Sequence, residues 1–154
     1  MSKKDKLIIY TDGGSRGNPG PAGVGVAICN EKGRTLRLSS GQAKYSKAIG
    51  VRTNNEAEYE AVIFAMQKIK QVFGKEKAKN FDIEIRMDSE LVARQLRGEY
   101  KILEEKLFPL FIKIWNLRMD FGPMVFKEIP RGENKEADAL ANEAMDKKEQ
   151  RGLF

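Results

Sequence analysis

Residues 10–25, YTDGGSRGNPGPAGVG, decide how the first half of the chain is organised. The stretch holds six glycines and two prolines, which predict a tight turn between two strands. The run LIIYT at 7–11 precedes it and is typical of a strand covered on both faces. AGVGVAI at 22–28 alternates and predicts the second strand. A single acid, Asp12, stands where the first strand meets the turn, and its position calls for an explanation.

The rest of the chain alternates between strand and helix patterns. A third strand is predicted at 34–40, and Thr53 and Glu56 form a capping box that begins a helix running to about Phe73. The remaining predicted elements are a strand at 81–87, helices at 89–97 and 102–119, a strand at 124–129, and a helix from the cap Asn134 to about Lys147. This order predicts an α/β fold with a five-stranded mixed sheet flanked by helices, in which three antiparallel strands are followed by two parallel ones.

The length and composition limit the class of protein. The 154 residues suit one domain, expected at 6–147 with short charged tails at 1–5 and 148–154. No apolar run approaches 18 residues and no signal peptide is evident, so we expect no membrane span and a cytoplasmic location. We also expect a monomer. The chain has one cysteine and no histidine, which excludes histidine catalysis and histidine metal ligation.

The charge is spread unevenly. Residues 1–77 hold 14 Lys and Arg against 7 Asp and Glu, a net charge of +7, whereas residues 78–154 hold 14 against 15. A basic half suits a polyanionic partner such as nucleic acid. A surface charge that only keeps the protein soluble is an equally good interpretation.

The helix that begins after Thr53 carries glutamates on two faces. Glu56 and Glu60 lie on the face of this helix that is expected to be exposed to solvent. Glu58 lies in line with Val62 and Ile69, on the apolar stripe that should face the sheet. An ionised carboxylate there costs on the order of several kcal/mol unless a cation or a donor meets it. We therefore expect Glu58 to be functional and its two neighbours to be structural.

Two aspartates are expected at the same edge of the sheet as Glu58. Asp12 ends the first strand, and Asp88 ends the strand at 81–87. These two strands are expected to run in the same direction, so both aspartates should lie at one edge of the sheet, where the helix of Glu58 also begins. Asp138 lies at the border of the last helix's apolar stripe, and strand directions do not fix its place. Each aspartate alone could be a turn or first-turn acid. Together, at least three carboxylates at one edge predict a site for a hard cation such as Mg²⁺ or Mn²⁺.

Such a site predicts phosphoryl chemistry. Two hard cations can clamp the attacking and leaving oxygens of a phosphodiester. The glycines around Asp12 are expected to let the backbone come close to a sugar-phosphate chain. The glycine-rich stretch matches neither a Walker A loop nor GxGxxG.

Four motifs in order resemble type 1 ribonuclease H: TDGGSRGNPGPAGVGVAI, TNNEAEYEA, MDSELVARQL and ENKEADALAN. The resemblance covers about 6–145 and places the family's four acids on Asp12, Glu58, Asp88 and Asp138. It implies that these residues hold two Mg²⁺ ions, for which Mn²⁺ could substitute. It further implies hydrolysis of the RNA strand of an RNA–DNA hybrid, leaving a 5′-phosphate and a 3′-hydroxyl.

The resemblance also suggests contacts with the substrate. Asn18, Asn54 and Asn55 would lie beside the minor groove, where 2′-hydroxyls distinguish RNA from DNA. Thr53 would hold a phosphate of the DNA strand, although Val51 stands where the family has a basic residue. The other expected substrate-binding residues are Gly13, Gly14, Ser15, Arg16 and Ser89.

Two family features are absent from this sequence. The loop before the last helix lacks the family's mobile histidine; Arg131, Glu133 or the neighbouring Asn134 could assist instead, or the loop could be purely structural. No basic, tryptophan-rich insertion follows residue 97, and Trp115 is expected in the core. Hybrid binding should then depend on basic residues of the first half, which include Lys44, Lys47 and Arg52.

Two other functions remain open at this point. One is a nucleic-acid-binding domain that keeps the fold without catalysis, which loss of an acid would favour; all four acids are present. The other is a nuclease for a different substrate, such as double-stranded RNA or a DNA junction, because one fold serves several nucleases. The missing insertion and histidine resemble compact members of the family, some of which also cut double-stranded RNA.

Overall fold

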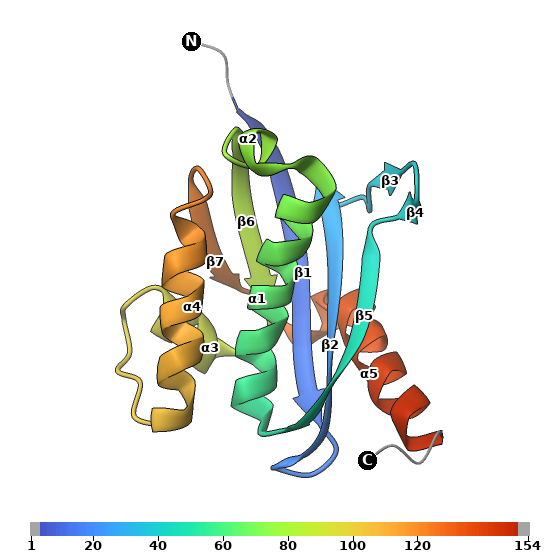
Figure 1. Ribbon diagram of the computed structural model, residues 1–154, viewed down its shortest axis with the longest axis vertical. Coiled ribbons are helices and arrows are strands. Elements are labelled where there is room, and N and C mark those ends of the chain that lie inside the picture. The colour runs from blue at the N-terminus through green and yellow to red at the C-terminus, as the bar shows by residue number, and fades with distance from the viewer. Residues whose placement is uncertain (1–3, 151–154) are drawn as a thin grey trace.

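One five-stranded mixed sheet organises the computed structural model, which describes residues 4–150. The strand order is β5-β2-β1-β6-β7 (Figure 1). The strands of this sheet are β1 (Asp5–Ser15), β2 (Gly20–Asn30), β5 (Lys44–Arg52), β6 (Phe81–Met87) and β7 (Met124–Glu128). The helices are α1 (Asn54–Phe73), α2 (Lys75–Ala78), α3 (Glu90–Leu96), α4 (Phe108–Arg118) and α5 (Lys135–Gln150).

Strand directions follow the prediction. β1 pairs antiparallel with β2, with Asp12 opposite Gly25, and β2 pairs antiparallel with β5. β6 runs parallel to both β1 and β7. The apolar run of β1 is buried because helices cover both sheet faces: α1, α3 and α4 lie on one side and α5 on the other (Figure 1).

The position of the third strand was predicted wrongly. Residues 34–40 form no strand of the main sheet; β3 (Arg37–Leu38) pairs only with β4 (Gly41–Gln42) in a small ribbon. The third strand is instead β5, which pairs with β2 alone and forms an edge of the sheet. An edge strand half open to water needs no strict apolar alternation, so the polar sequence KYSKAIGVR gave little strand signal.

α1 follows its sequence pattern closely. Thr53 Oγ1 accepts a hydrogen bond from the Glu56 backbone N–H at 3.1 Å, and Glu56 Oε1 accepts one from the Thr53 N–H at 2.9 Å. This capping box satisfies two helix-end donors and fixes where the helix begins. Val62, Met66 and Ile69 are fully buried against the sheet, and burial of each such side chain contributes about 1.5–3 kcal/mol.

Other element boundaries differ from the prediction. Residues 102–104 are not helical; a 3₁₀ turn (Glu105–Leu107) leads into α4, which has Pro109 in its first turn. Ile114 of α4 is buried, but Trp115 is 58% exposed, so its expected core position was wrong. Adjacent helical residues point about 100° apart, and Ile114 takes the inner side.

Regular elements extend slightly beyond residues 6 and 147, the expected bounds of the domain. β1 begins at Asp5 and α5 continues to Gln150, so parts of the expected tails belong to regular elements. Residues 1–3 and 151–154 of those tails lie outside the described residues. Within residues 4–150, no helix is long and apolar enough to cross a membrane.

Candidate active site

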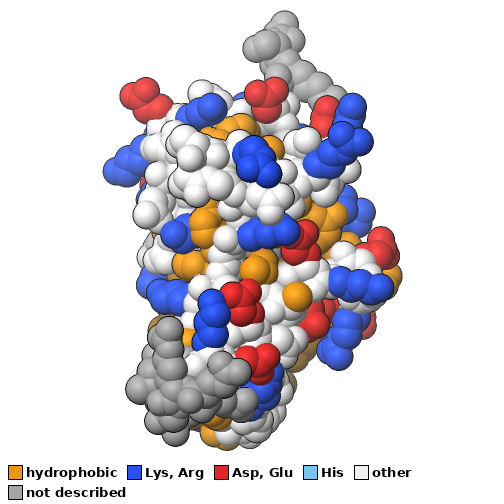
Figure 2. Space-filling model, turned by 90° about the vertical axis from the view of Figure 1, so that its right-hand side faces the viewer, with side chains coloured by type: hydrophobic (Ala, Val, Ile, Leu, Met, Phe, Trp, Pro, Cys, Tyr) orange, Lys and Arg blue, Asp and Glu red, His pale blue; other side chains and the backbone are white. Residues whose placement is uncertain are grey.

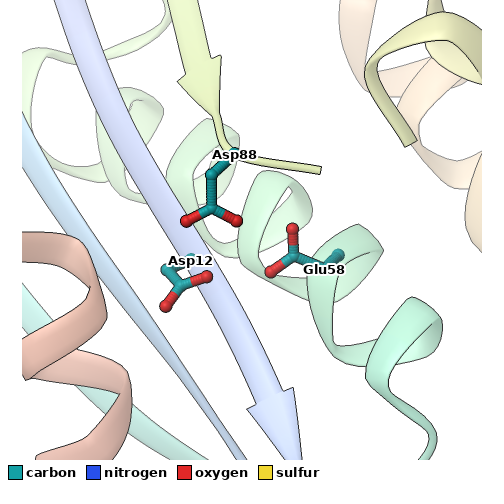
Figure 3. Close-up of side chains that lie close together, drawn as sticks. All are labelled: Asp12, Glu58 and Asp88. Atoms are coloured by element: carbon teal, nitrogen blue, oxygen red, sulfur yellow. The ribbon is translucent and has the colours of Figure 1, made fainter. Parts of the chain in front are cut away.

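Three of the four predicted acids meet at one edge of the sheet. Asp12 lies near the end of β1, Glu58 in the second turn of α1, and Asp88 directly after β6. Figure 3 shows their carboxyl groups turned toward one another from these three elements. One oxygen of each lies within 4.8 Å of the others. The convergence expected from strand directions is therefore present.

Gly13 allows α1 to approach β1 this closely. A Cβ at this position would lie 2.1 Å from the backbone oxygen of Ala57, so no larger residue fits unless the helix moves. The same closeness lets the Gly13 N–H donate to Glu58 Oε1 at 2.7 Å. Gly23 and Gly25 pack in a similar way against α5. These two glycines are therefore covered by α5, whereas Gly13 and Gly14 line the cleft described below.

Burial and like charges shape the ionisation of the cluster. Asp12 is 8% exposed and Glu58 is 9% exposed. Burial, followed by the neighbouring charges of Glu58 and Asp88, raises the pKa of Asp12 far above its usual range. Burial also raises the pKa of Glu58, although hydrogen bonds from Asp12 and Gly13 oppose it. No ion pair within residues 4–150 involves these carboxyl groups, so a bound cation would relieve their repulsion.

Asp138 joins the site from α5, as the family resemblance implied. It is half-buried, lies outside the tight group of three, and contributes to the raised pKa of Asp12. A cleft of ≈ 430 Å³ opens between the elements that carry the acids. Its lining residues are Asp12, Gly13, Gly14, Ser15, Arg16, Asn54, Asn55, Glu58, Asp88, Ser89, Arg131, Asp138, Asn142 and Met145.

Asn134 connects three elements beneath the acids. Its fully buried side chain donates from Nδ2 to the Thr11 carbonyl at 2.9 Å and to Asp88 Oδ2 at 3.3 Å. Its Oδ1 accepts no hydrogen bond from any described residue, so the expected side-chain cap of the last helix was wrong. Arg131 lines the cleft, whereas Glu133 is exposed and is not among its lining residues.

The expected substrate contacts separate into two groups. Asn54, Asn55 and Ser89 face the cleft, together with residues 13–16. Asn18 and Thr53 are not part of the lining. Asn18 Oδ1 accepts from the Asn54 backbone N–H at 3.0 Å, while the Thr53 hydroxyl serves the capping box. Both hold the start of α1 in place.

Two lining residues of α5 were not predicted. Asn142 and Met145 both face the cleft, and Asn142 follows Asp138 by four positions, so helical spacing could have identified it. Asn142 Oδ1 accepts from Arg16 Nη2 at 3.2 Å, and Asp146 Oδ1 accepts from the same nitrogen at 2.6 Å. Arg16 thus fastens the glycine-rich turn to α5.

Comparisons with known proteins agree with this geometry. The family described as "Reverse transcriptase-like" matches residues 10–144. Ribonuclease HI of Halobacterium salinarum is 39% identical over 141 residues, which cover 92% of this chain and 65% of that protein. The "Bifunctional protein Rv2228c" of Mycobacterium tuberculosis is 38% identical over 92% of this chain, but the chain spans only 36% of that relative's length.

Solved structures are similar along nearly the whole chain. LC11-RNase H1 in complex with an RNA/DNA hybrid is 50% identical, with a TM-score of 0.83 over 92% of this chain and 98% of that one. RNase H1 from Halobacterium salinarum is 38% identical, with a TM-score of 0.80 over 92% and 98% of the two chains. The strand order, the converging acids and these matches lead to one conclusion: the chain belongs to the ribonuclease H family.

Proposed function

We propose that this protein is a metal-dependent endoribonuclease that hydrolyses the RNA strand of RNA–DNA hybrids and leaves 5′-phosphate and 3′-hydroxyl ends. The cluster of Asp12, Glu58 and Asp88, with carboxylate oxygens within 4.8 Å of one another, is the observation that carries the proposal. The bound hybrid in the LC11-RNase H1 structure supports the choice of substrate.

The donor set suits two Mg²⁺ ions, with Mn²⁺ as a substitute. It consists of carboxylate oxygens alone, which hard cations prefer. Burial raises the pKa values of Asp12 and Glu58, and the charge of Asp88 adds to both shifts, so the protein itself does little to stabilise the ionised form of these groups. The two ions would be held by Asp12, Glu58, Asp88 and Asp138: Asp12 would serve both, Asp138 would serve the activation of water, and Glu58 and Asp88 would serve the departure of the leaving oxygen. Two bound ions would supply activation of water and stabilisation of the leaving oxygen.

The other side chains of the cleft have positioning roles in this proposal. The Gly13 N–H holds Glu58 Oε1, and Asn134 Nδ2 holds Asp88 Oδ2, so both carboxyl groups keep their orientation before substrate arrives. Asn54 and Asn55 line the cleft and bring amide groups that can both donate to and accept from a ribose 2′-hydroxyl. Ser89, next to Asp88, also lines the cleft, and its hydroxyl caps α3 by accepting from the Val92 N–H at 3.2 Å.

The test compares substrates of one sequence: an end-labelled RNA–DNA hybrid, double-stranded RNA and double-stranded DNA, each incubated with Mg²⁺, Mn²⁺ or EDTA. We expect metal-dependent cutting of the hybrid's RNA strand and no cutting with EDTA. Cleavage of double-stranded RNA would widen the substrate range. Binding of the hybrid without cleavage in either metal would contradict the proposal and favour a non-catalytic binding domain.

A further inference from the structure

Two neighbouring asparagines at the start of α1 hold their side-chain amides in opposite senses. Asn54 Oδ1 accepts from the Ser15 backbone N–H at 3.0 Å. Asn55 Nδ2 donates to Glu104 Oε1 at 2.7 Å. A backbone N–H can only donate and an ionised carboxylate can only accept, so these two partners fix which end of each amide faces them. Both asparagines line the cleft that contains the acids.

The remaining atoms of the two amides differ in polarity. Within residues 4–150, Asn54 Nδ2 donates no hydrogen bond and Asn55 Oδ1 accepts none. A ribose 2′-hydroxyl can both accept and donate, whereas a deoxyribose has no such group. The pair thus leaves one donor and one acceptor free for a ligand in the cleft, and a 2′-hydroxyl can use both.

Glu104 is held in place by the segment between α3 and α4. Its carbonyl accepts from the Leu107 N–H at 3.0 Å, and the fully buried Leu107 fixes this 3₁₀ turn in the core. The buried Gln95 accepts from the Tyr59 hydroxyl of α1 at 2.7 Å and donates to the Lys101 carbonyl at 3.3 Å. The segment is therefore fastened to α1, the helix that begins with the two asparagines.

Positive charge on the surface does not by itself distinguish ribose from deoxyribose. Figure 2 shows the side of the molecule where Figure 1 places β5 and α5, and its Lys and Arg side chains are spread among acidic and hydrophobic ones. Two expected hybrid-binding cations of β5 already have partners, since Lys44 pairs with Glu136 and Arg52 pairs with Glu60. Selectivity for RNA therefore depends on groups that reach the 2′-hydroxyl, such as the two amides.

We propose that Glu104 is a positioning residue that keeps the Asn55 oxygen available to accept a hydrogen bond from a ribose 2′-hydroxyl of the bound RNA strand. This inference rests on the proposed function. Glu104 acts through the amide of Asn55 and does not touch the substrate. Its own charge has the opposite effect, because a carboxylate near a polyanion weakens binding. The positioning role and the charge of Glu104 therefore predict opposite results when its side chain is removed.

The test measures binding in an Asp12→Asn background, in which the substrate stays intact. Glu104→Ala should weaken binding of the RNA–DNA hybrid about fivefold, which corresponds to one oriented hydrogen bond. A hybrid whose RNA strand carries 2′-fluoro groups cannot donate to Asn55, so its affinity should change less than about twofold. Glu105→Ala removes the same charge from the adjacent exposed residue and should weaken neither complex.

Two further measurements make the assignment specific. Asn55→Ala with Glu104→Ala should bind the hybrid no more weakly than Asn55→Ala alone, because Glu104 acts only through Asn55. In an NMR spectrum of the substrate-free protein, the side-chain amide signals of Asn55 should shift in Glu104→Ala and not in Glu105→Ala.

Unchanged or stronger hybrid binding by Glu104→Ala, additive losses in the double variant, or unshifted Asn55 signals would overturn the inference. Hybrid cleavage by the unmodified protein tests the proposed function separately. The NMR comparison needs neither substrate nor cleavage, so the two failures are distinguishable.

Discussion

Two buried glutamates of this protein have opposite surroundings. Glu58 is 9% exposed and Glu84 is 8% exposed, so the exposed fraction of the residue does not distinguish them. Glu84, on β6, hydrogen-bonds Arg86 and lies 3.4 Å from Lys6 Nζ; burial tends to raise its pKa, but these cations outweigh it and lower the pKa. Glu58 lies beside Asp12 and Asp88 instead; burial raises its pKa, and the charge of Asp88 adds to the increase.

The comparison shows what marks a site in this fold. A buried acid whose charge is matched by the protein contributes to structure, whereas a buried acid held beside other acids carries a charge that an external cation must balance. Glu58 and Glu84 should therefore respond in opposite ways when each is changed to glutamine, which keeps the shape and removes the charge.

The largest effect is expected at Asp12, the centre of the unmatched cluster. Asp12→Asn should lower hybrid cleavage by at least about 1000-fold, because the lost charge stabilisation is worth several kcal/mol. The fold and hybrid binding should persist. Single-turnover cleavage and circular dichroism measure the two properties, and near-normal cleavage by this variant would refute the proposed mechanism.

The second prediction compares glutamine substitutions at Glu58 and Glu84. Glu58→Gln should lower cleavage by about 100-fold without loss of stability, because the Gln oxygen can still accept from the Gly13 N–H. Glu84→Gln should leave cleavage by the folded protein nearly unchanged but lower the free energy of unfolding by about 1–3 kcal/mol, since Arg86 loses its charged partner.

Urea unfolding and cleavage assays on the same samples separate these outcomes. Glu60→Gln, on the outer face of α1, is the control and should change cleavage less than about threefold. An equal loss of activity in Glu60→Gln and Glu58→Gln would contradict the distinction between the two helix faces.

A smaller loss is expected at Asn134, which positions Asp88. Asn134→Ala should lower the turnover number by about 10-fold, within the range seen when a partner of a metal ligand is removed, and should raise the Mg²⁺ concentration needed for half-maximal rate. A Mg²⁺ titration of activity provides the measurement. A loss of stability with an unchanged Mg²⁺ requirement would make Asn134 purely structural.

The smallest effect concerns stability against pH without divalent cations. A carboxyl group whose pKa is raised on folding contributes stability that is full below its unfolded pKa and lost as pH rises through its folded pKa. The unfolding free energy of the metal-free protein should therefore fall relative to Asp12→Asn as the pH rises from about 4 to about 10, by at most about 1.4 kcal/mol for each pH unit.

Glu84 should show the opposite trend, because its pKa is lowered: its contribution is present above the unfolded pKa and lost in acid. Chemical unfolding at a series of pH values, with and without Mg²⁺, measures both trends. Added Mg²⁺ should stabilise the unmodified protein at high pH but not Asp12→Asn. A flat pH dependence in the metal-free protein would contradict a raised pKa for Asp12 in the folded state.

Features that depend on residues close together in the chain could be predicted from the sequence. The capping box of Thr53 and Glu56 fixed the start of α1, and helical phase then assigned Glu58 to the inner face and Glu60 to the outer one. Strand directions were enough to bring Asp12 and Asp88 to the same edge. Helical periodicity and the alternation of strand directions can both be read from the sequence, and the structure agrees with these predictions.

Features that depend on partners far apart in the chain could be seen only in the folded structure. β5 is a strand because β2 offers it an edge, and Trp115 is exposed because Ile114 takes the inner side of α4. Asn134 bonds to Asp88 and to the Thr11 carbonyl instead of capping α5, and Asp138 reaches the cleft only through the packing of that helix on β2. Such contacts join residues far apart in the chain, and no periodicity within one segment encodes them.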